Sequence, residues 1–220
     1  MSIIATSTIK LRITALFVAT ALLSGCASLL GTQPTEPASE AQLTAWDSHA
    51  RALESMADWA FDGRAAVRSG VTGGSVQLDW TQVGPVTSLV LSGPFDTGRL
   101  AMTGTPSHML LTDGKGNQRV TDDPEALLEQ QTGWRIPLAT LPRWVRGLPS
   151  HSLDALSAGD YRLDDQGRLA AFTDDDGWEV EYDRYQDVGR LALPHFVELS
   201  HDGMRIRIVV DTWDIGQTPR

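Results

Sequence analysis

From Phe61 onward, apolar residues of the chain alternate with polar ones, which is the pattern of β-strands with one buried face. Ala65 and Val67, for example, alternate with Arg64 and Arg68. Turn sequences rich in glycine, proline and aspartate separate such runs. They are Gly73-Gly74, Gly84-Pro85, Gly93-Pro94, Asp113 to Gly116, Asp164 to Gly167, Asp174 to Gly177 and Asp202-Gly203. The pattern predicts antiparallel strands joined by hairpins.

Helical spacing interrupts this pattern in three places. Residues 41–57 have apolar side chains at three- and four-residue intervals, and shorter helices are expected at 123–131 and about 138–146. The first helix is expected to pack on a sheet, because a helix lying on a membrane surface is usually richer in lysine and arginine. The predicted fold class is α+β, with a single strongly curved antiparallel sheet and helices against one of its faces.

The first 25 residues have the pattern of a bacterial secretory signal peptide. Lys10 and Arg12 precede an apolar run of eleven residues, too short to span a bilayer, and Leu23-Ser24-Gly25-Cys26 resembles a lipobox. We expect residues 1–25 to be removed and Cys26 to carry lipid, rather than to remain as a stray thiol after ordinary cleavage. Residues 26–40 are then a flexible tether, and residues 41–220 form one domain.

The expected mature chain is strongly acidic. Removal of residues 1–25 leaves 16 basic and 28 acidic residues, a formal charge of −12. This charge argues against nucleic acid as a partner, because binding to phosphate requires a basic surface. Cys26 is the only cysteine, which excludes an intramolecular disulfide.

Residue patterns typical of enzymes and metal sites are missing from the sequence. Neither a Gly-x-Ser-x-Gly motif nor a phosphate-binding glycine loop occurs, and the five histidines are scattered. Asp174-Asp175-Asp176-Gly177 lacks the ligand spacing of a calcium loop, which favours a solvated turn. We therefore expect no enzyme activity and no cofactor apart from lipid on Cys26. An acid-residue hydrolase is a distant alternative.

Aromatic residues suggest contact with lipid. The seven tryptophans fit either a packed core or a concave apolar pocket. Phe95 lies in the middle of a glycine- and proline-containing connection, Leu91 to Gly98, which is expected to be exposed. It either folds back onto the domain or inserts into a bilayer interface, and both interpretations remain open from the residues alone.

The mature sequence resembles the LolB family of outer-membrane lipoproteins, which accept other lipoproteins from the periplasmic carrier LolA. Segments of the resemblance cover nearly all of the predicted domain in the family's order. They include Phe61 to Val67, Gln77 to Gln82, Leu89 to Phe95, Gly133 to Leu138, Leu141 to Pro149, Gly177 to Tyr182 and Ile206 to Trp213. Gly-Trp-x-Ile-Pro-Leu, Trp-x-x-Gly-x-Pro and Gly-Trp-x-Val-x-Tyr are its most specific motifs.

This resemblance implies an open half-barrel with helices covering an apolar cavity. The candidate cavity residues are Trp80, Leu89, Leu91, Trp134, Ile136, Leu141, Trp144, Trp178 and Tyr182. It also implies that an apolar residue on the loop at Pro94 and Phe95 assists membrane insertion. Where the family often has leucine followed by glycine, this chain has Phe95 followed by Asp96, and a carboxylate resists deep burial.

The partners implied by the resemblance are the carrier LolA, cargo lipoproteins and outer-membrane lipid. The protein is expected on the periplasmic face of the outer membrane, because Ala27 follows the lipidated cysteine as in lipoproteins destined for that membrane. It is also expected to be a monomer. Transfer would proceed without ATP. The alternative function is binding of free lipid or another small hydrophobic ligand on the same scaffold.

Overall fold

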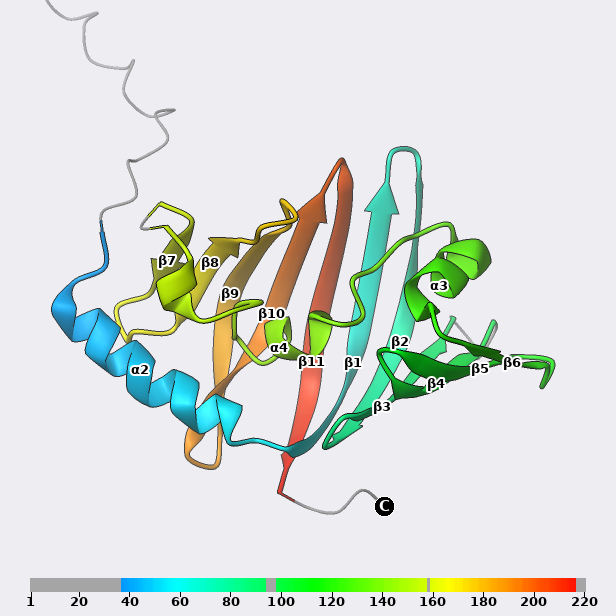
Figure 1. Cartoon of the computed structure of the whole chain (residues 1–220), viewed down its shortest axis with the longest axis horizontal. Coiled ribbons are helices and arrows are strands. Elements are labelled where there is room, and N and C mark those ends of the chain that lie inside the picture. The colour runs from blue at the N-terminus through cyan, green and yellow to red at the C-terminus, as the bar shows by residue number, and fades with distance from the viewer. Residues whose placement is uncertain (1–36, 94–97, 158, 217–220) are drawn as a thin grey trace, which may run out of the picture. The chain divides into compact units, whose positions relative to one another are not determined.

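The computed structural model describes residues 37–93, 98–157 and 159–216. These residues form one antiparallel sheet of eleven strands, with three short helices and a 3₁₀ turn (Figure 1). In spatial order the strands are β6 (Gln118–Thr121), β5 (His108–Asp113), β4 (Leu100–Thr105), β3 (Val86–Ser92), β2 (Thr72–Val83), β1 (Asp58–Ser69), β11 (Met204–Ile215), β10 (Leu191–His201), β9 (Glu179–Val188), β8 (Leu169–Thr173) and β7 (Tyr161–Leu163). The predicted single antiparallel sheet is therefore confirmed.

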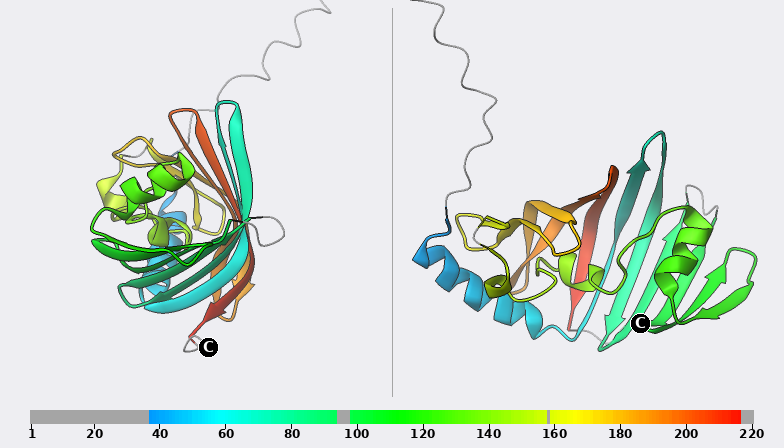
Figure 2. Two further views of the ribbon diagram at one scale, coloured as in Figure 1. Left: turned by 90° about the vertical axis from the view of Figure 1, so that its right-hand side faces the viewer. Right: turned by 45° about the horizontal axis from the view of Figure 1, so that its top comes forward.

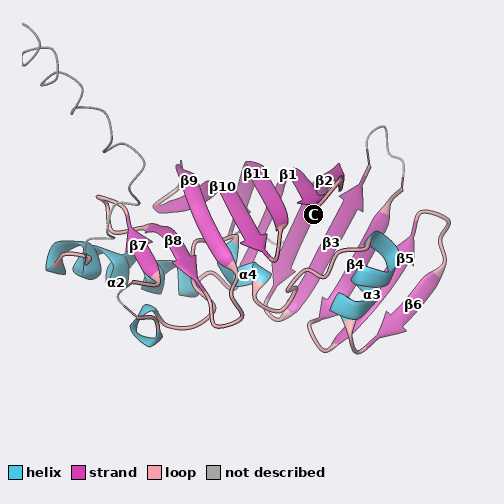
Figure 3. Ribbon diagram, turned by 90° about the horizontal axis from the view of Figure 1, so that it is seen from above, coloured by secondary structure: helices cyan, strands magenta, loops and turns pink. Residues whose placement is uncertain are grey.

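The sheet is curved. It is also open, because no pairing joins its edge strands β6 and β7 within the described residues. Its concave side faces α2 (Glu40–Glu54), α3 (Pro124–Thr132), α4 (Leu141–Trp144) and the 3₁₀ turn η3 (Leu153–Ala155), as Figures 2 and 3 show from the end and from above. Each central strand buries alternate side chains on this side. On β1, for instance, Ala65 and Val67 are buried whereas Arg64 and Arg68 are exposed on the convex face, as the alternation predicts.

The curvature is accommodated by a bulge in β11, where Asp211 has no pairing partner on β1. The pairing of β1 with β11 shifts between Asp62 and Gly63, and a Cβ atom at position 63 would lie 2.2 Å from the carbonyl oxygen of Val209. Real Cβ atoms do not approach oxygen so closely, so only glycine allows β11 to pass here. Bulges of this kind bend a strand and increase its twist.

Two predicted helices begin and end at different residues in the structure. The first ends at Glu54 instead of residue 57, because the chain turns into β1 and the carbonyl of Ala57 accepts a hydrogen bond from the backbone N–H of Gly84. Ser39 caps its other end in a capping box with Gln42. For the helix predicted at 123–131, Asp123 is the residue that caps α3, accepting from the N–H of Ala126.

The helix predicted at 138–146 is mostly a series of turns. Only Leu141–Trp144 is helical, and Pro142, which has no N–H, stands in its first turn. Gly147 then adopts a left-handed conformation with φ of 88° and ends the segment. The predicted helix is therefore too long, although Leu138, Leu141, Trp144 and Val145 of this segment are buried.

Candidate functional site

The nine candidate cavity residues meet in one apolar cluster on the concave side of the sheet. Six of them are buried in its core, and Leu91, Trp134 and Ile136 are half-buried against it. The buried six are Trp80, Leu89, Leu141, Trp144, Trp178 and Tyr182. The residues of the cluster lie far apart in the sequence, because the cluster joins β2 and β3 to β9 through the segment that follows α3.

Three further aromatic residues extend the cluster and were not among the predicted site residues. Trp59 and Phe61 of β1 contact both Trp80 and Trp213 of β11, with ring centres 5.0 to 5.9 Å apart. The indole N–H of Trp213 donates to the carbonyl of Pro194 at 2.9 Å. The alternation of Trp59 and Phe61 with Asp58, Ala60 and Asp62 was the available signal for their inward orientation.

A second group of aromatics joins the segment around α4 to the sheet. Trp144 is fully buried and lies 5.8 Å from Trp178 and 6.0 Å from Phe172, measured between ring centres. The hydroxyl of Tyr182 donates to the carbonyl of Trp144 at 2.8 Å, and burial raises the pKa of this hydroxyl well above its usual value. Tyr182 therefore remains a neutral donor that fastens the α4 segment to β9.

Arg146 fastens the same segment to α2. One guanidinium nitrogen donates to the carbonyls of Leu53 and Met56 at 3.1 and 3.0 Å, and Nε donates to the carbonyl of Pro142 at 2.9 Å. The guanidinium also lies over the ring of Trp59, 5.7 Å from its centre. Burial lowers the pKa of Arg146 to about 10, so it stays charged at neutral pH. No sequence signal predicted this contact.

A groove of about 500 Å³ opens beside this cluster, at the end of the sheet that holds the turn between β10 and β11. Trp134 and Pro137 lie along one side of the groove, and Trp178 and Met204 contribute further apolar lining. Glu125, Arg135, Asp176, His201 and Asp202 contribute polar groups. The groove is therefore partly polar, and its apolar lining adjoins the buried cluster at Trp134 and Trp178.

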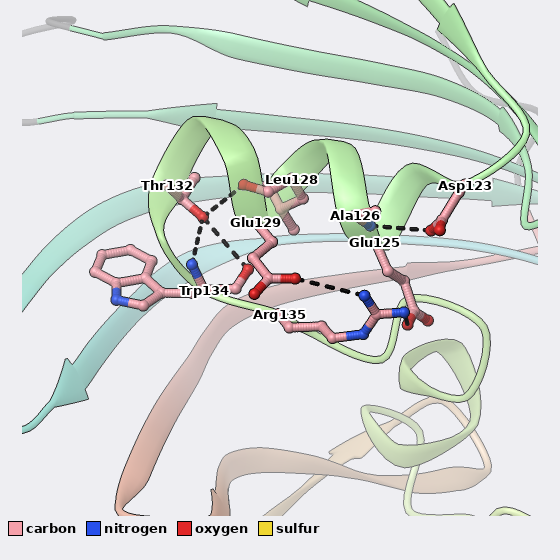
Figure 4. A network of polar contacts seen from close by, with 8 residues as sticks. All are labelled: Asp123, Glu125, Ala126, Leu128, Glu129, Thr132, Trp134 and Arg135. Atoms are coloured by element: carbon pink, nitrogen blue, oxygen red, sulfur yellow. Dashed lines mark hydrogen bonds and ion pairs between the residues drawn. The ribbon is translucent and has the colours of Figure 1, made fainter.

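The end of α3 holds Trp134 in place (Figure 4). The hydroxyl of Thr132 donates to the carbonyl of Leu128 at 2.8 Å and accepts from the N–H of Trp134 at 3.2 Å. Arg135 contacts Glu129 at 3.4 Å and Glu125 at 3.8 Å, which ties the next residue back to the same helix. The indole of Trp134 is thereby kept at the groove while its ring stays half-buried.

Cys26, Pro94 and Phe95 all lie outside the described residues. Gly93 and Gly98 are the described residues on either side of positions 94–97. Gly93 follows β3 and Gly98 precedes β4, at the end of the sheet that also holds the turn between β1 and β2.

Residues 57–213 match the family model described as outer membrane lipoprotein LolB. The chain belongs to the LolB family. An outer-membrane lipoprotein LolB of Pseudomonas paraeruginosa is 35% identical over 96% of this chain and 100% of its own length. Another LolB, of Chromohalobacter salexigens, is 32% identical over 90% of this chain and 88% of its own. Membership in LolB makes this chain a lipoprotein of the outer membrane.

The solved structure of a LolA superfamily protein from Nitrosomonas europaea has low similarity to this LolB chain. The TM-score is 0.47 at 10% identity, covering 83% of this chain and 96% of that one. Such a similarity is too low to say anything about function.

Within the described ranges of this LolB chain, no three histidine, aspartate or glutamate residues lie close enough together to bind a metal ion. Asp174 instead stabilises its own turn, accepting from the N–H groups of Asp176 and Trp178 at 3.0 and 2.9 Å. None of the described helices combines the length and apolar composition needed to cross a bilayer.

His49 of α2 in this LolB chain packs against Tyr185 of β9. Its ring lies edge-on to Tyr185, and its buried Nε2 has no hydrogen-bond partner among the described residues. Burial, and secondarily the charge of Arg168, lower the pKa of His49, while Asp164 opposes them. The folded chain therefore binds this proton less readily than the unfolded chain does.

We expect wild-type stability to be full above pH 6.5 and to fall as pH drops from there through the lowered pKa. His49→Phe removes this titration, so its urea midpoint should fall less between pH 7 and pH 5 than that of the wild type. His108→Gln is the control, since His108 is exposed and paired only with Asp122. An unchanged pH dependence in His49→Phe would contradict the assignment.

Proposed function

We propose that this protein accepts lipoproteins from the periplasmic carrier LolA and inserts them into the outer membrane. The acyl chains of the cargo would be sheltered between the concave side of the sheet and the helices that cover it. The observation that supports this most directly is the convergence of the nine candidate residues in one apolar cluster, beside a groove lined by Trp134 and Trp178.

Entry at this groove fits the distribution of packing. The α4 segment is held by Arg146, Tyr182 and the fully buried Trp144, whereas the segment that carries Trp134 and Ile136 is only half-buried. A half-buried segment loses fewer contacts when it moves. We infer that acyl chains enter by displacing the segment at 133–137, while the α4 segment stays in place.

The packed cluster also suggests why the receptor can release its cargo. A sixteen-carbon acyl chain removed from water gains roughly 12 kcal/mol, at about 0.8 kcal/mol for each methylene. Separating Trp134 and Ile136 from the cluster costs part of this free energy, because those contacts must be broken before the chain enters. Net affinity is thereby kept below that of the bilayer, and cargo moves on to the membrane without ATP.

The N-terminal region supplies the anchor in this proposal. Cleavage after residue 25 leaves Cys26 for lipid attachment, and residues 26–40 connect it to the domain at 41–220. Several acyl chains on one cysteine give durable anchoring, since a single chain binds membranes only reversibly. The loop at Pro94 and Phe95 would enter the bilayer interface when cargo is released.

Transfer from the carrier tests the proposed function. Purified mature protein should take a radiolabelled lipoprotein from LolA in solution. Most of the label should move when receptor and LolA are equimolar, because the receptor is proposed to bind acyl chains more tightly than the carrier does. The measurement is the fraction of label that co-elutes with each protein. Cargo that stays on LolA, together with free phospholipid in native mass spectra of the purified protein, would show a lipid-binding protein instead.

A further inference from the structure

Two hairpins project from one end of the sheet (Figure 1). The β1–β2 hairpin turns at Gly70 and Val71, and the neighbouring β10–β11 hairpin turns at Asp202 and Gly203. Pairing of β2 with β3 starts only at Gln77, so the first five residues of β2 extend beyond the end of β3. The β1–β2 turn therefore protrudes from its neighbours on that side.

Val71 is an unusual residue for such a turn. Its side chain is fully exposed, more than that of any other large apolar residue in the described ranges. A Cβ atom at the preceding Gly70 would have no neighbour within 4 Å, which shows that open space surrounds the turn. Nothing in the described domain therefore shields Val71 from water.

Three arginines lie behind this turn along the strands, on the convex face of the sheet. Arg68 of β1 is directly opposite Arg205 of β11, and Arg207 is opposite Ala66. Like charges in register destabilise a strand pair. A groove of about 950 Å³ runs between these three arginines and the backbone of the β1–β2 hairpin.

The carboxylates nearest to this groove lie outside its lining. Glu198 is shared by Arg205 and Arg207, at 3.1 and 2.6 Å, and Asp202 contacts His201 at 3.2 Å. Arg68 forms no ion pair with any residue of the described ranges. The lining of this groove thus brings three guanidinium groups and no carboxylate beside Val71, while Glu179, Glu198 and Asp202 lie next to it.

We propose that this surface, formed by Val71, Arg68, Arg205 and Arg207, docks on the headgroups of anionic phospholipids. Arg68 is paired with Gly73, so it lies two residues behind Val71, or about 7 Å at about 3.4 Å per residue. The polar region on each side of a bilayer is roughly 5 to 8 Å deep. Val71 can therefore lie at the edge of the hydrocarbon while the guanidinium groups reach the phosphates, which arginine binds with paired hydrogen bonds.

Docking in this way would orient the whole domain. Ser69 and Met204, at the bases of the two hairpins, also line the groove beside Trp134. Contact of the hairpin tip with the membrane therefore turns this groove toward the bilayer. A flexible tether alone would fix no such orientation. An acidic protein is the competing partner, but it would not require an apolar side chain at the tip.

Vesicle binding in the absence of carrier and cargo tests this inference independently of the receptor function. The mature chain with Cys26→Ala is mixed with phosphatidylcholine vesicles, with and without one third phosphatidylglycerol, and the bound fraction is measured by sedimentation. Binding should be stronger with phosphatidylglycerol and should weaken at high salt. Val71→Glu and Arg68→Glu should each reduce the partition coefficient about tenfold.

Matched controls lie elsewhere on the sheet. Val120→Glu changes an exposed valine on the edge strand β6, and Arg190→Glu changes an exposed arginine in the turn at the opposite end, so both should stay within twofold of the parent. Val71→Ser repeats the test without a new charge. Equal losses in the controls, or no preference for phosphatidylglycerol, would overturn the proposal. Normal vesicle binding by Arg68→Glu with lost binding to LolA would overturn it in favour of an acidic protein partner.

Discussion

Phe95→Glu is expected to leave capture of cargo intact and to slow its release into liposomes by roughly 30-fold to 150-fold. A phenylalanine moved from water into an apolar environment contributes about 2 to 3 kcal/mol, and each 1.4 kcal/mol corresponds to a factor of ten. Glutamate loses this contribution and adds a carboxylate that resists leaving water. Release is the step that needs the bilayer interface, so release is the step that slows.

Two measurements separate these steps. Capture is the fraction of labelled lipoprotein taken from LolA in solution, and release is the rate at which label moves to liposomes. Phe95→Leu is the control, because leucine is apolar and should retain at least half of the wild-type rate. An equal loss of capture and release in Phe95→Glu would refute the division of labour between the loop and the apolar cluster.

Asp96 offers a further check on insertion depth. A carboxylate beside Phe95 limits how far the loop enters the hydrocarbon. Asp96→Gly should therefore speed release or leave it unchanged, whereas a slower release would mean that Asp96 itself contacts the cargo or the carrier.

The sheet could be predicted from the sequence because side-chain alternation has the same period as the strand. Ala65 and Val67 are buried and their arginine neighbours are exposed, as the pattern requires. The edge strand β6, Gln118–Thr121, was missed. It has four residues with only Val120 apolar, and that side chain is exposed, so no alternation marks it.

Cavity candidates could be assigned to one face, but their packing could not be predicted. Periodicity places Trp80 and Trp178 on the concave side, yet whether side chains fill the space between sheet and helices depends on the exact path of the covering segments. Arg146 shows this limit most clearly. Its partners, the carbonyls of Leu53 and Met56, lie 93 and 90 residues away in the sequence.

Trp144→Ala is expected to cost about 3 to 5 kcal/mol of the free energy of unfolding, the range for a fully buried tryptophan. The indole is completely buried, packs on Phe172 and Trp178, and donates to the hydroxyl of Ser150 at 3.0 Å. Alanine leaves a cavity and removes the hydrogen bond that the Ser150 hydroxyl accepts, while that hydroxyl still donates to Asp174. Urea denaturation with an unchanged m-value would measure the loss.

Trp134→Ala is the matched comparison, because the same substitution then falls on the groove. Trp134 is half-buried, so truncation should cost about 1 to 2 kcal/mol of stability. Its effect on capture should be the larger one, since the segment at 133–137 is the proposed entry for acyl chains. A Trp134→Ala variant that captures cargo as well as the wild type would exclude this entry. A loss of stability equal to that of Trp144→Ala would instead show that the segment belongs to the fixed core, and that acyl chains must enter by moving another element.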